Sequence, residues 1–446
     1  MMRKSFLKLT PPSEFFKILN SFGERTDSET IPTIDALGRI SVADVPSPID
    51  LPDFTRSTVD GFAVMSKDTH GASGSIPSYL ELSGDIPVGE ISESARITIS
   101  SGEAVRVVTG GMVPEGADSV VMLEYTDLID KTTLEVRRGV SHLENLVVPG
   151  EDMKKGDLVV KCGAPLRPFD IGALTGVGIT EIEVFKKPVV SIFSTGGEVV
   201  EPTETPNTGQ IRDVNKYGVS AGVLESGGIP NRMDNVEDDL DSLKGALKEG
   251  IESSDMVILS GGSSMGNMDF TLDAINELAQ LDQQHGQSSP GVLVHGISIK
   301  PGKPTIYGIV NNTPIFGLPG HPVGALIVFL IFVAPMIGII GGVNNPLNAI
   351  DGDDIDSNFD DTDYINSALF VQAKIDRNIS GAPGRDYYIP VKLSTQGDGD
   401  IPTATPLLGK SGMISILTMS TGLICIPSMK EGVLAGENVK VSLFKT

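Results

Sequence analysis

Two lysines in a short loop are the most chemically informative residues of this chain. Lys300 and Lys303 lie in the segment Ile297 to Pro304, whose two prolines and one glycine give the loop a defined shape. Two ammonium groups held close together repel each other, and an anion between or beside them relieves the repulsion. Because the whole chain carries a formal net charge of −24, a local cationic loop indicates a bound oxyanion or phosphate. The alternative is a solvated turn without a ligand.

Glycine-rich segments follow two expected strands and point to the same kind of ligand. Residues 189–193 form an apolar strand that leads into residues 194–198, and residues 255–259 form another that leads into residues 260–269. A strand that ends in a Gly/Ser loop is a common way to hold backbone N–H groups against a phosphate. Residues 314–323 form a further loop built from Gly and Pro. Together these loops predict a crevice at the carboxyl ends of parallel strands.

Acidic residues could add a magnesium–phosphate site to this crevice. Glu198 and Asp269 each follow a glycine loop at an expected strand end. Mg²⁺ binds through a few carboxylates together with phosphate oxygens, so these two positions are candidate metal ligands. Asp60 and Asp152 lie in turns, and Asp238 lies at an expected helix start. For those three, local sequence alone favours a structural role.

The elements that position these residues indicate an α/β multidomain protein. Strands alternate with helices expected at residues 214–225 and 238–249, which predicts a mostly parallel sheet covered on both faces. Asp213 is the expected N-cap of the first helix, and Gly227 is its expected stop. Short β-like segments with turn residues predict β-rich domains on either side. The expected domains are an N-terminal linker domain (1–50 and 147–187), a β-rich inserted domain (51–146), an α/β domain (188–345) and a C-terminal β-rich domain (346–446).

Composition narrows the function classes. Acidic residues outnumber basic ones 58 to 34, which disfavours nucleic acid and anionic membranes as partners. The two cysteines, Cys162 and Cys425, provide neither a disulfide framework nor a metal-ligand cluster, and we expect buried thiols. No secretory signal is readable at the N-terminus, so we expect a cytoplasmic location. His295 and His321 lie close to the site loops, and we expect a structural role for both.

One apolar segment has the length of a membrane-spanning helix. Residues 323–342 carry no charge and are apolar on all sides. Pro335 interrupts the segment, glycines crowd its end, and no lysine or arginine flanks it. We therefore predict a buried helix that closes the α/β domain.

Short motifs in a fixed order cover nearly the whole chain. They are Ser57 to Ala63, Thr109 to Asp118, Gly150 to Asp152, Ser194 to Glu198, Ser260 to Asp269, Lys300 to Pro304 and Gly317 to Val323. As a set they resemble the molybdopterin molybdotransferase family, which includes the E domain of gephyrin. The resemblance implies Mg²⁺-dependent ligation of molybdate, or tungstate, to adenylated molybdopterin, with release of AMP and formation of molybdenum cofactor. It also implies a central molybdopterin-binding α/β domain.

The resemblance assigns roles to individual positions. The catalytic positions would be Asp60, Thr109, Asp152, Asp238, Lys300 and Lys303. The substrate-binding positions would be Thr195, Gly196, Ser260, Gly261, Gly262, Gly266, Pro301, Pro304 and Ser411, and the metal ligands Glu198 and Asp269. Asp60 and Thr109 are expected to reach the α/β domain of a second subunit, which implies a homodimer with composite sites. An upstream molybdopterin adenylyltransferase is an expected partner.

Three departures from the family pattern leave alternatives open. Gly197 replaces a common acidic residue, Val147-Val148-Pro149 stands where an arginine is frequent, and His321 replaces the asparagine of Gly-Asn-Pro-Val-Ser. These changes leave open a preference for tungstate and a reduced turnover. A second interpretation is a non-catalytic molybdopterin-binding or scaffold protein of the same fold. A third, an adenylyltransferase of molybdopterin, is disfavoured by the β-rich domains on both sides of the α/β domain.

Overall fold

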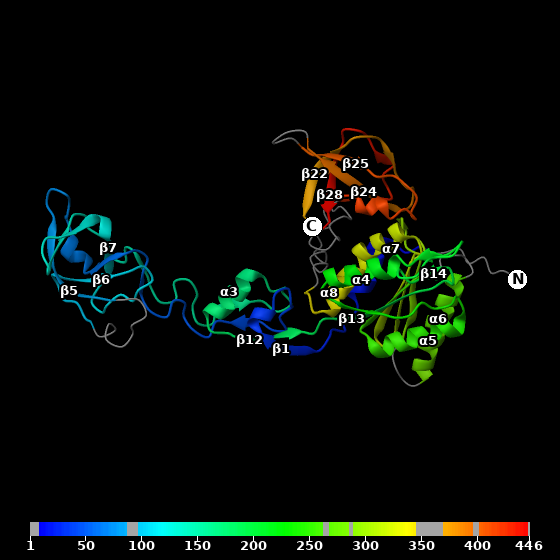
Figure 1. Cartoon of the computed structure of the whole chain (residues 1–446), viewed down its shortest axis with the longest axis horizontal. Helices are drawn as coiled ribbons and strands as arrows, with labels where there is room; N and C mark the ends of the chain where they lie inside the picture. The colour runs from blue at the N-terminus through cyan, green and yellow to red at the C-terminus, as the bar shows by residue number, and fades with distance from the viewer. Residues whose placement is uncertain are drawn as a thin grey trace.

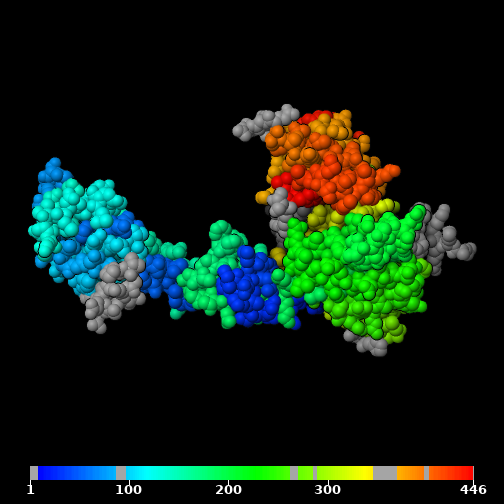
Figure 2. Space-filling view, viewed as in Figure 1, coloured from blue at the N-terminus to red at the C-terminus, as the bar shows by residue number. Residues whose placement is uncertain are grey.

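The computed structural model describes residues 9–86, 97–261, 267–284, 289–344, 369–395 and 401–444, with the backbone alone for residues 267–269. The chain is elongated (Figure 1). A β-rich unit lies at one end, a slender connector follows, and an α/β unit with a β-barrel beside it forms the other end (Figures 1 and 2).

The α/β unit is built on a six-stranded sheet of order β16-β13-β17-β21-β20-β18. The first four of these strands are parallel, and β20 and β18 are antiparallel to their neighbours. The predicted mostly parallel sheet is therefore confirmed. The strands are β13 (Val189–Ser194), β16 (Ile229–Arg232), β17 (Met256–Ser260), β18 (Gly291–His295), β20 (Ile306–Val310) and β21 (Thr313–Leu318).

Successive side chains along the central strands point to opposite faces of this sheet, so each face has its own hydrophobic core. Ile258 packs on the face covered by α4 (Asn215–Glu225), whereas Val257 and Leu259 pack on the face covered by α5 (Leu240–Ser253) and α6 (Asn267–Gln284). The first helix, α1 (Pro12–Asn20), also belongs to the α4 face, since its two phenylalanines are buried in that core. Helix α1 thus packs on the α/β unit and not in the connector.

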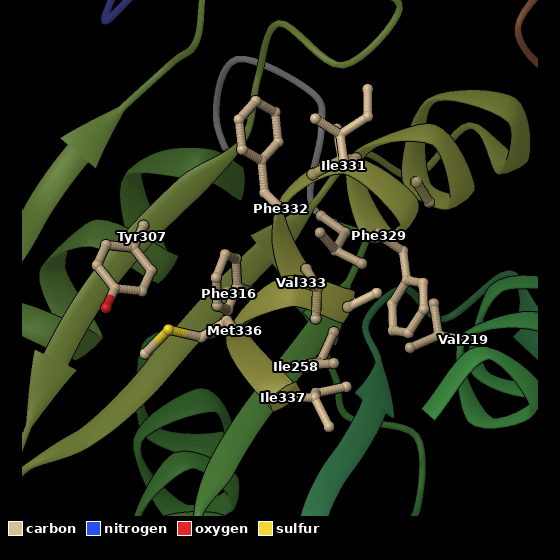
Figure 3. Close-up of a cluster of buried hydrophobic side chains, with 14 of the residues drawn as sticks. Val219, Ile258, Tyr307, Phe316, Phe329, Ile331, Phe332, Val333, Met336 and Ile337 are labelled. Carbon is tan, nitrogen blue, oxygen red and sulfur yellow. The ribbon is translucent and has the colours of Figure 1, made fainter. Parts of the chain in front are cut away.

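The long apolar segment is a core helix. It runs through α7 (Pro322–Val328), a π-helical turn (Phe329–Val333) and α8 (Ala334–Ile340). Among the described residues this one helix is long and apolar enough to cross a membrane, but 83% of its most apolar window is buried inside the protein, as in core helices of soluble proteins. Figure 3 shows Phe329 and Val333 beside Val219 and Ile258 of the same core.

Pro335 lies where the α-helix resumes after an interruption, and it does not end the helix. A proline removes one N–H and clashes with the carbonyl four residues earlier. The π-helical turn, which ends at Val333, widens the backbone immediately before the proline, and the helix continues to Ile340.

The connector consists of two chain segments that run antiparallel to each other. Its pairs are β1 (Ser28–Pro32) with β12 (Glu181–Phe185), β2 (Val45–Pro46) with β11 (Leu158–Val160), and β3 (Arg56–Ser57) with β10 (Leu146–Val147), together with helix α3 (Pro168–Gly176). Beyond β3 the chain forms the distal sheet, six strands of order β7-β4-β6-β5-β9-β8. They are β4 (Gly61–Val64), β5 (Ser78–Asp85), β6 (Glu103–Val107), β7 (Ser119–Met122), β8 (Thr126–Leu128) and β9 (Thr133–Val136).

The C-terminal β-rich unit is a closed barrel. Strand β24 pairs with β25 and with β26, and the pairs β25–β22, β22–β28 and β28–β26 complete the ring. Strand β19 (Ile299–Lys300) pairs parallel with β24. The segment Ile297 to Pro304, here called the lysine loop, is therefore attached to the barrel. The barrel strands are β22 (Phe370–Ile375), β24 (Asp386–Ser394), β25 (Thr403–Pro406), β26 (Gly422–Ile426) and β28 (Asn438–Leu443).

Candidate active site

A cavity of about 320 Å³, here called the carboxylate cavity, opens at the carboxyl ends of β13 and β17. Parallel α/β sheets bind ligands at this edge. Glu198 and Asp238 supply acidic groups to its wall. The predicted binding positions on the wall are Thr195, Ser260 and Gly261.

Glycine is required where the two strand ends approach each other. Gly261 has φ +125°, and a Cβ built there would lie 2.3 Å from the backbone oxygen of Thr195. Gly196 has φ +124°, and its Cβ would lie 2.7 Å from a carboxylate oxygen of Glu198. Both conformations are ones that L side chains rarely adopt, so the glycines set the shape of this wall.

Two buried polar residues at the start of α4, Asp213 and Asn215, line the carboxylate cavity. The Asn215 Nδ2 donates to Ser260 Oγ at 2.7 Å and to the Gly320 backbone oxygen at 2.9 Å. The N-cap position of α4 is Val214, one residue later than expected, and the Oδ1 of Asp213 accepts the Lys216 backbone N–H at 2.9 Å from just before the helix. The Lys216 ammonium is buried against Glu201 and Asn235. Local sequence did not identify Asn215 or Lys216, because their burial depends on contacts with distant segments such as Ser260, Gly320 and Asn235.

Asp238 lies next to a helix cap and is not the cap itself. Helix α5 begins at Leu240, two residues later than expected, and extends to Ser253. The side chain of Asp239 caps it by accepting the N–H groups of Asp241 and Ser242. Asp238 therefore lines the carboxylate cavity, while Asp239 accepts the backbone N–H groups at the start of α5.

A second cavity of about 380 Å³, here called the oxyanion cavity, lies between the lysine loop, the start of α7 and the barrel. Lys300 Nζ lies 4.0 Å from the centroid of the Tyr387 ring, a cation–π contact that fixes its direction. Arg385, immediately before β24, adds a third cation to the lining. The predicted residues Pro301, Lys303, Pro304 and Ser411 also line it.

Close packing against its neighbours fixes the conformation of the lysine loop. Gly302 has φ +119°, and a Cβ there would lie 2.6 Å from side-chain atoms of both Ile299 and Val328. The Lys303 backbone oxygen accepts the Ile297 N–H at 3.0 Å. Ser411 is tied to the start of α7, because its backbone oxygen accepts the Val323 N–H at 3.0 Å. The loop, the helix and the barrel therefore hold one another in place.

His321 lines both cavities, so the two adjoin at its side chain. It precedes the first turn of α7, and a Cβ on Gly412 of the barrel would lie 3.6 Å from its ring. The carboxylate cavity is lined by Glu198, Asp213 and Asp238 together with Arg212, and the oxyanion cavity by Lys300, Lys303 and Arg385. The sequence placed His321 close to the site loops, with an expected structural role, and marked it as a departure from a family pattern.

Asp60 and Thr109 form a separate pair in the distal sheet. One Asp60 oxygen accepts the Thr109 backbone N–H at 2.7 Å and its hydroxyl at 2.9 Å. These two hydrogen bonds, with a smaller contribution from the charge of Arg106, lower the pKa of the Asp60 carboxyl below its ordinary value. The distal sheet beside which the pair lies is at the other end of the chain from the α/β unit (Figure 1).

The structure does not assemble all predicted positions within one chain. Asp152 lies in the connector, where its backbone N–H donates to Leu51 at 3.1 Å, and it lines neither cavity. Gly262 and Gly266 lie outside the described residues, as does the side chain of Asp269. Within the described ranges, no three His, Cys, Asp or Glu side chains are gathered as a metal site. Glu198 and Asp238 offer oxygen ligands of the type that Mg²⁺ accepts beside phosphate and water.

Known proteins resemble the chain along its full length. Residues 10–178 match the MoeA N-terminal region (domain I and II), residues 191–338 a probable molybdopterin binding domain, and residues 372–444 the MoeA C-terminal region (domain IV). A putative molybdopterin biosynthesis protein of Methanocaldococcus jannaschii is 32% identical over 448 residues, 98% of each chain. A molybdopterin molybdenumtransferase of Bacillus subtilis is 32% identical over 330 residues, 73% of this chain and 74% of that protein.

A solved structure agrees with these matches. The molybdopterin biosynthesis MoeA protein of Pyrococcus horikoshii is 32% identical, with a TM-score of 0.78 over 98% of this chain and 100% of that one. The fold and the central match place the chain in the class of proteins built around a molybdopterin-binding-type α/β domain. Within that class the chain belongs to the MoeA family, an assignment that the matches to both flanking regions carry. It is a transferase enzyme of molybdenum-cofactor biosynthesis.

Proposed function

We propose that the chain inserts molybdate or tungstate into adenylated molybdopterin in a Mg²⁺-dependent reaction that releases AMP. The observation that supports this proposal is the adjacency of the oxyanion cavity, with Lys300, Lys303 and Arg385, to the carboxylate cavity, with Glu198 and Asp238. An oxyanion, a pterin dithiolene and phosphates repel one another when they meet. Lysine and arginine side chains held beside the reacting groups offset the repulsion among these anions.

Each cavity has a distinct part in this reaction. Lys300, Lys303 and Arg385 bind and orient the tetrahedral oxyanion, with the arginine offering a planar set of donors and the lysines acting as point charges. The predicted metal ligands Glu198 and Asp269, joined by Asp238 from the cavity wall, would hold Mg²⁺, which neutralises phosphate charge when bound. The backbone at Gly196 and Gly261 allows close approach of the ligand. No covalent enzyme intermediate is required.

The active site is completed by a second copy of the chain. Asp60 and Thr109 are proposed catalytic residues, yet the distal sheet lies at the opposite end of one chain from the α/β unit and the barrel, which line the cavities (Figure 1). A homodimer in which each distal sheet reaches the partner's α/β unit would unite them. The lowered pKa of Asp60 keeps this carboxylate ionised when it meets the partner's cations. Asp152 in the connector would accompany it. We expect a cytoplasmic enzyme supplied by an upstream molybdopterin adenylyltransferase.

Metal insertion tests this function directly. The purified chain would be incubated with adenylated molybdopterin and Mg²⁺, with molybdate and tungstate supplied separately, and AMP release would be measured. AMP release that depends on the oxyanion is the expected result, and the oxyanion that supports faster release identifies the metal. Tight binding of molybdopterin without AMP release would instead favour a non-catalytic binding protein, and Gly197 and Val147 would be the first positions to restore to the family pattern.

A further inference from the structure

Lys216 has a buried ammonium group that the chemistry described so far does not use. The residue is 2% exposed and lies in the first turn of α4, directly after Asn215. An ammonium group offers three N–H donors. Its acceptors here are the Glu201 carboxylate, the Asn235 Oδ1 at 2.7 Å and the Met233 backbone oxygen at 3.3 Å. A buried charge is costly unless it is paired and hydrogen-bonded, so this complete set of acceptors fixes the side chain in place.

The acceptors of this ammonium come from the same chain segments that line the carboxylate cavity. Glu198 lines the cavity and lies shortly before Glu201 in the chain. Asp238 lines it and lies shortly after Asn235, in the segment between β16 and α5. Asn215, which precedes the lysine, lines it as well. One buried cation therefore joins the three segments that carry these lining residues.

Backbone hydrogen bonds extend the network from Asn235 to the end of β13. The Asn235 Nδ2 donates to the Val199 backbone oxygen at 3.2 Å. The next residue, Val236, donates its backbone N–H to the Ser194 oxygen at 2.9 Å and accepts the N–H of Gly196 at 3.2 Å. The two acidic segments of the cavity are therefore tied side by side, and the buried ammonium lies at their junction.

We infer that Lys216 is a positioning residue that fixes the spacing of Glu198 and Asp238 for a divalent cation. This inference rests on the proposed function, which makes these carboxylates Mg²⁺ ligands, and adds to it the group that holds them. Lys216 does not contact the substrate, because its donors are committed and it is not among the described residues that line either cavity. Groups behind metal ligands orient those ligands and thereby set metal affinity.

The sign of the expected effect separates positioning from simple electrostatics. The charge of Lys216, taken alone, repels a divalent cation at the neighbouring carboxylates. If only that repulsion mattered, removal of the charge would strengthen metal binding. If Lys216 positions the ligands, its removal weakens metal binding, because the two carboxylates lose their fixed spacing.

Mn²⁺ binding to the full-length chain is the first test. Mn²⁺ takes carboxylate and water ligands as Mg²⁺ does, and the loss of the free-ion electron paramagnetic resonance signal measures its binding. The relevant site is the one that Asp238→Asn removes. We expect Lys216→Met, which removes the charge and keeps an unbranched side chain, to lower the Mn²⁺ affinity of this site about 10- to 100-fold. Molybdate affinity, measured by equilibrium dialysis, should stay within about twofold, since the oxyanion cavity has other ligands.

Lys244→Met is the matched control. It also removes one positive charge, but Lys244 pairs with Asp241 and Glu277 and is not among the described residues that line either cavity. It should leave both affinities unchanged. An unchanged or higher Mn²⁺ affinity in a folded Lys216→Met variant would overturn the inference. An equal loss of Mn²⁺ and molybdate affinity, or the lack of any Mn²⁺ site that Asp238→Asn removes, would overturn it too.

A second variant decides the question if Lys216→Met does not fold. Asn235→Ala leaves the ammonium its bonds to Glu201 and Met233 but breaks the link to Val199. We expect Mn²⁺ affinity to fall about tenfold. Where both variants fold, the double variant should lose no more affinity than Lys216→Met alone, because both substitutions break one connection. Full Mn²⁺ affinity in Asn235→Ala would contradict the inference.

The outcome can be separated from that of the proposed function. If the unaltered chain releases AMP in an oxyanion-dependent manner but Lys216→Met binds Mn²⁺ normally, the positioning role is wrong and the reaction stands. If Mn²⁺ affinity depends on Lys216 and no AMP is released with either oxyanion, the positioning role stands and the insertion reaction is wrong.

Discussion

At the scale of single residues, the Asp60–Thr109 pair shows how hydrogen bonds stabilise the ionised form of a carboxyl group. Two Thr109 donors converge on one oxygen of Asp60 and lower its pKa. Because the pKa is lower in the folded state, these contacts favour folding above the ordinary pKa of aspartate. That contribution is lost as the pH falls through the folded-state value.

Thr109→Val should raise the pKa of Asp60. The substitution removes the hydroxyl donor and keeps the backbone N–H, so the shift should be reversed in part only. Carboxyl chemical shifts of Asp60 followed against pH would measure it. Thr132→Val, which removes a hydroxyl bonded to the distant Asp130, is the control and should leave Asp60 unchanged. An Asp60 pKa that is the same with and without the Thr109 hydroxyl would contradict the prediction.

The cations of the oxyanion cavity should govern anion affinity without governing the fold. Lys303→Ala and Arg385→Gln each remove one charge from the lining. We expect molybdate affinity, measured by equilibrium dialysis, to fall about tenfold or more in each, since charge-assisted hydrogen bonds are the strong ones. Metal insertion should be abolished in Lys303→Ala.

Arg377→Gln provides a matched control in the same barrel. Arg377 pairs with Asp376 and does not line the oxyanion cavity. Its loss should leave molybdate binding as in the unaltered chain. A folded Lys303→Ala variant with full insertion activity would remove Lys303 from the site.

At the scale of elements, strand ends and their glycines shape the carboxylate cavity. Gly261→Ala would place a methyl group 2.3 Å from the Thr195 backbone oxygen at φ +125°. We expect a loss of about 1–3 kcal/mol in the free energy of unfolding, the usual cost of such backbone strain. Gly245→Ala, in the interior of α5 with nothing within 4 Å of the new Cβ, should instead be stabilising by about 0.5–1 kcal/mol. Urea denaturation of both variants measures the contrast, and a neutral Gly261→Ala would contradict it.

The elements also show which parts of the site are readable from sequence. The apolar segments of β13 and β17, each followed by glycine, identify the strand ends because a buried parallel strand and its loop are local patterns. Arg385 was not identifiable in this way, because only the pairing of β19 with β24 brings it to the lysine loop. Asp213 was expected as the N-cap of α4, one residue before the observed N-cap, and the burial of its second oxygen was not readable from local sequence. Local sequence therefore identifies the loops, and long-range packing decides which side chains face the ligand.

At the scale of the whole molecule, the elongated shape separates two groups of predicted catalytic residues. The distal sheet carries Asp60 and Thr109, and the α/β unit with the barrel carries the lysine loop (Figure 1). A connector of paired strands keeps the two ends apart, so one chain does not bring these groups together. If both groups act on one substrate, a second copy of the chain must supply one of them, and sedimentation should report a dimer.

Complementation between two inactive variants distinguishes this arrangement from a site within one chain. In a dimer of Asp60→Asn with Lys303→Ala, one composite site would combine an intact Asp60 with an intact Lys303, and the other site would carry both substitutions. Random mixing of the two chains before refolding or during coexpression gives half heterodimers, so about a quarter of the insertion activity should return. Two sites that each lie within one chain would restore nothing, because every site would then carry one substitution. Mixing Lys300→Ala with Lys303→Ala, which alter the same loop, is the control and should restore no activity under either arrangement if each variant alone is inactive.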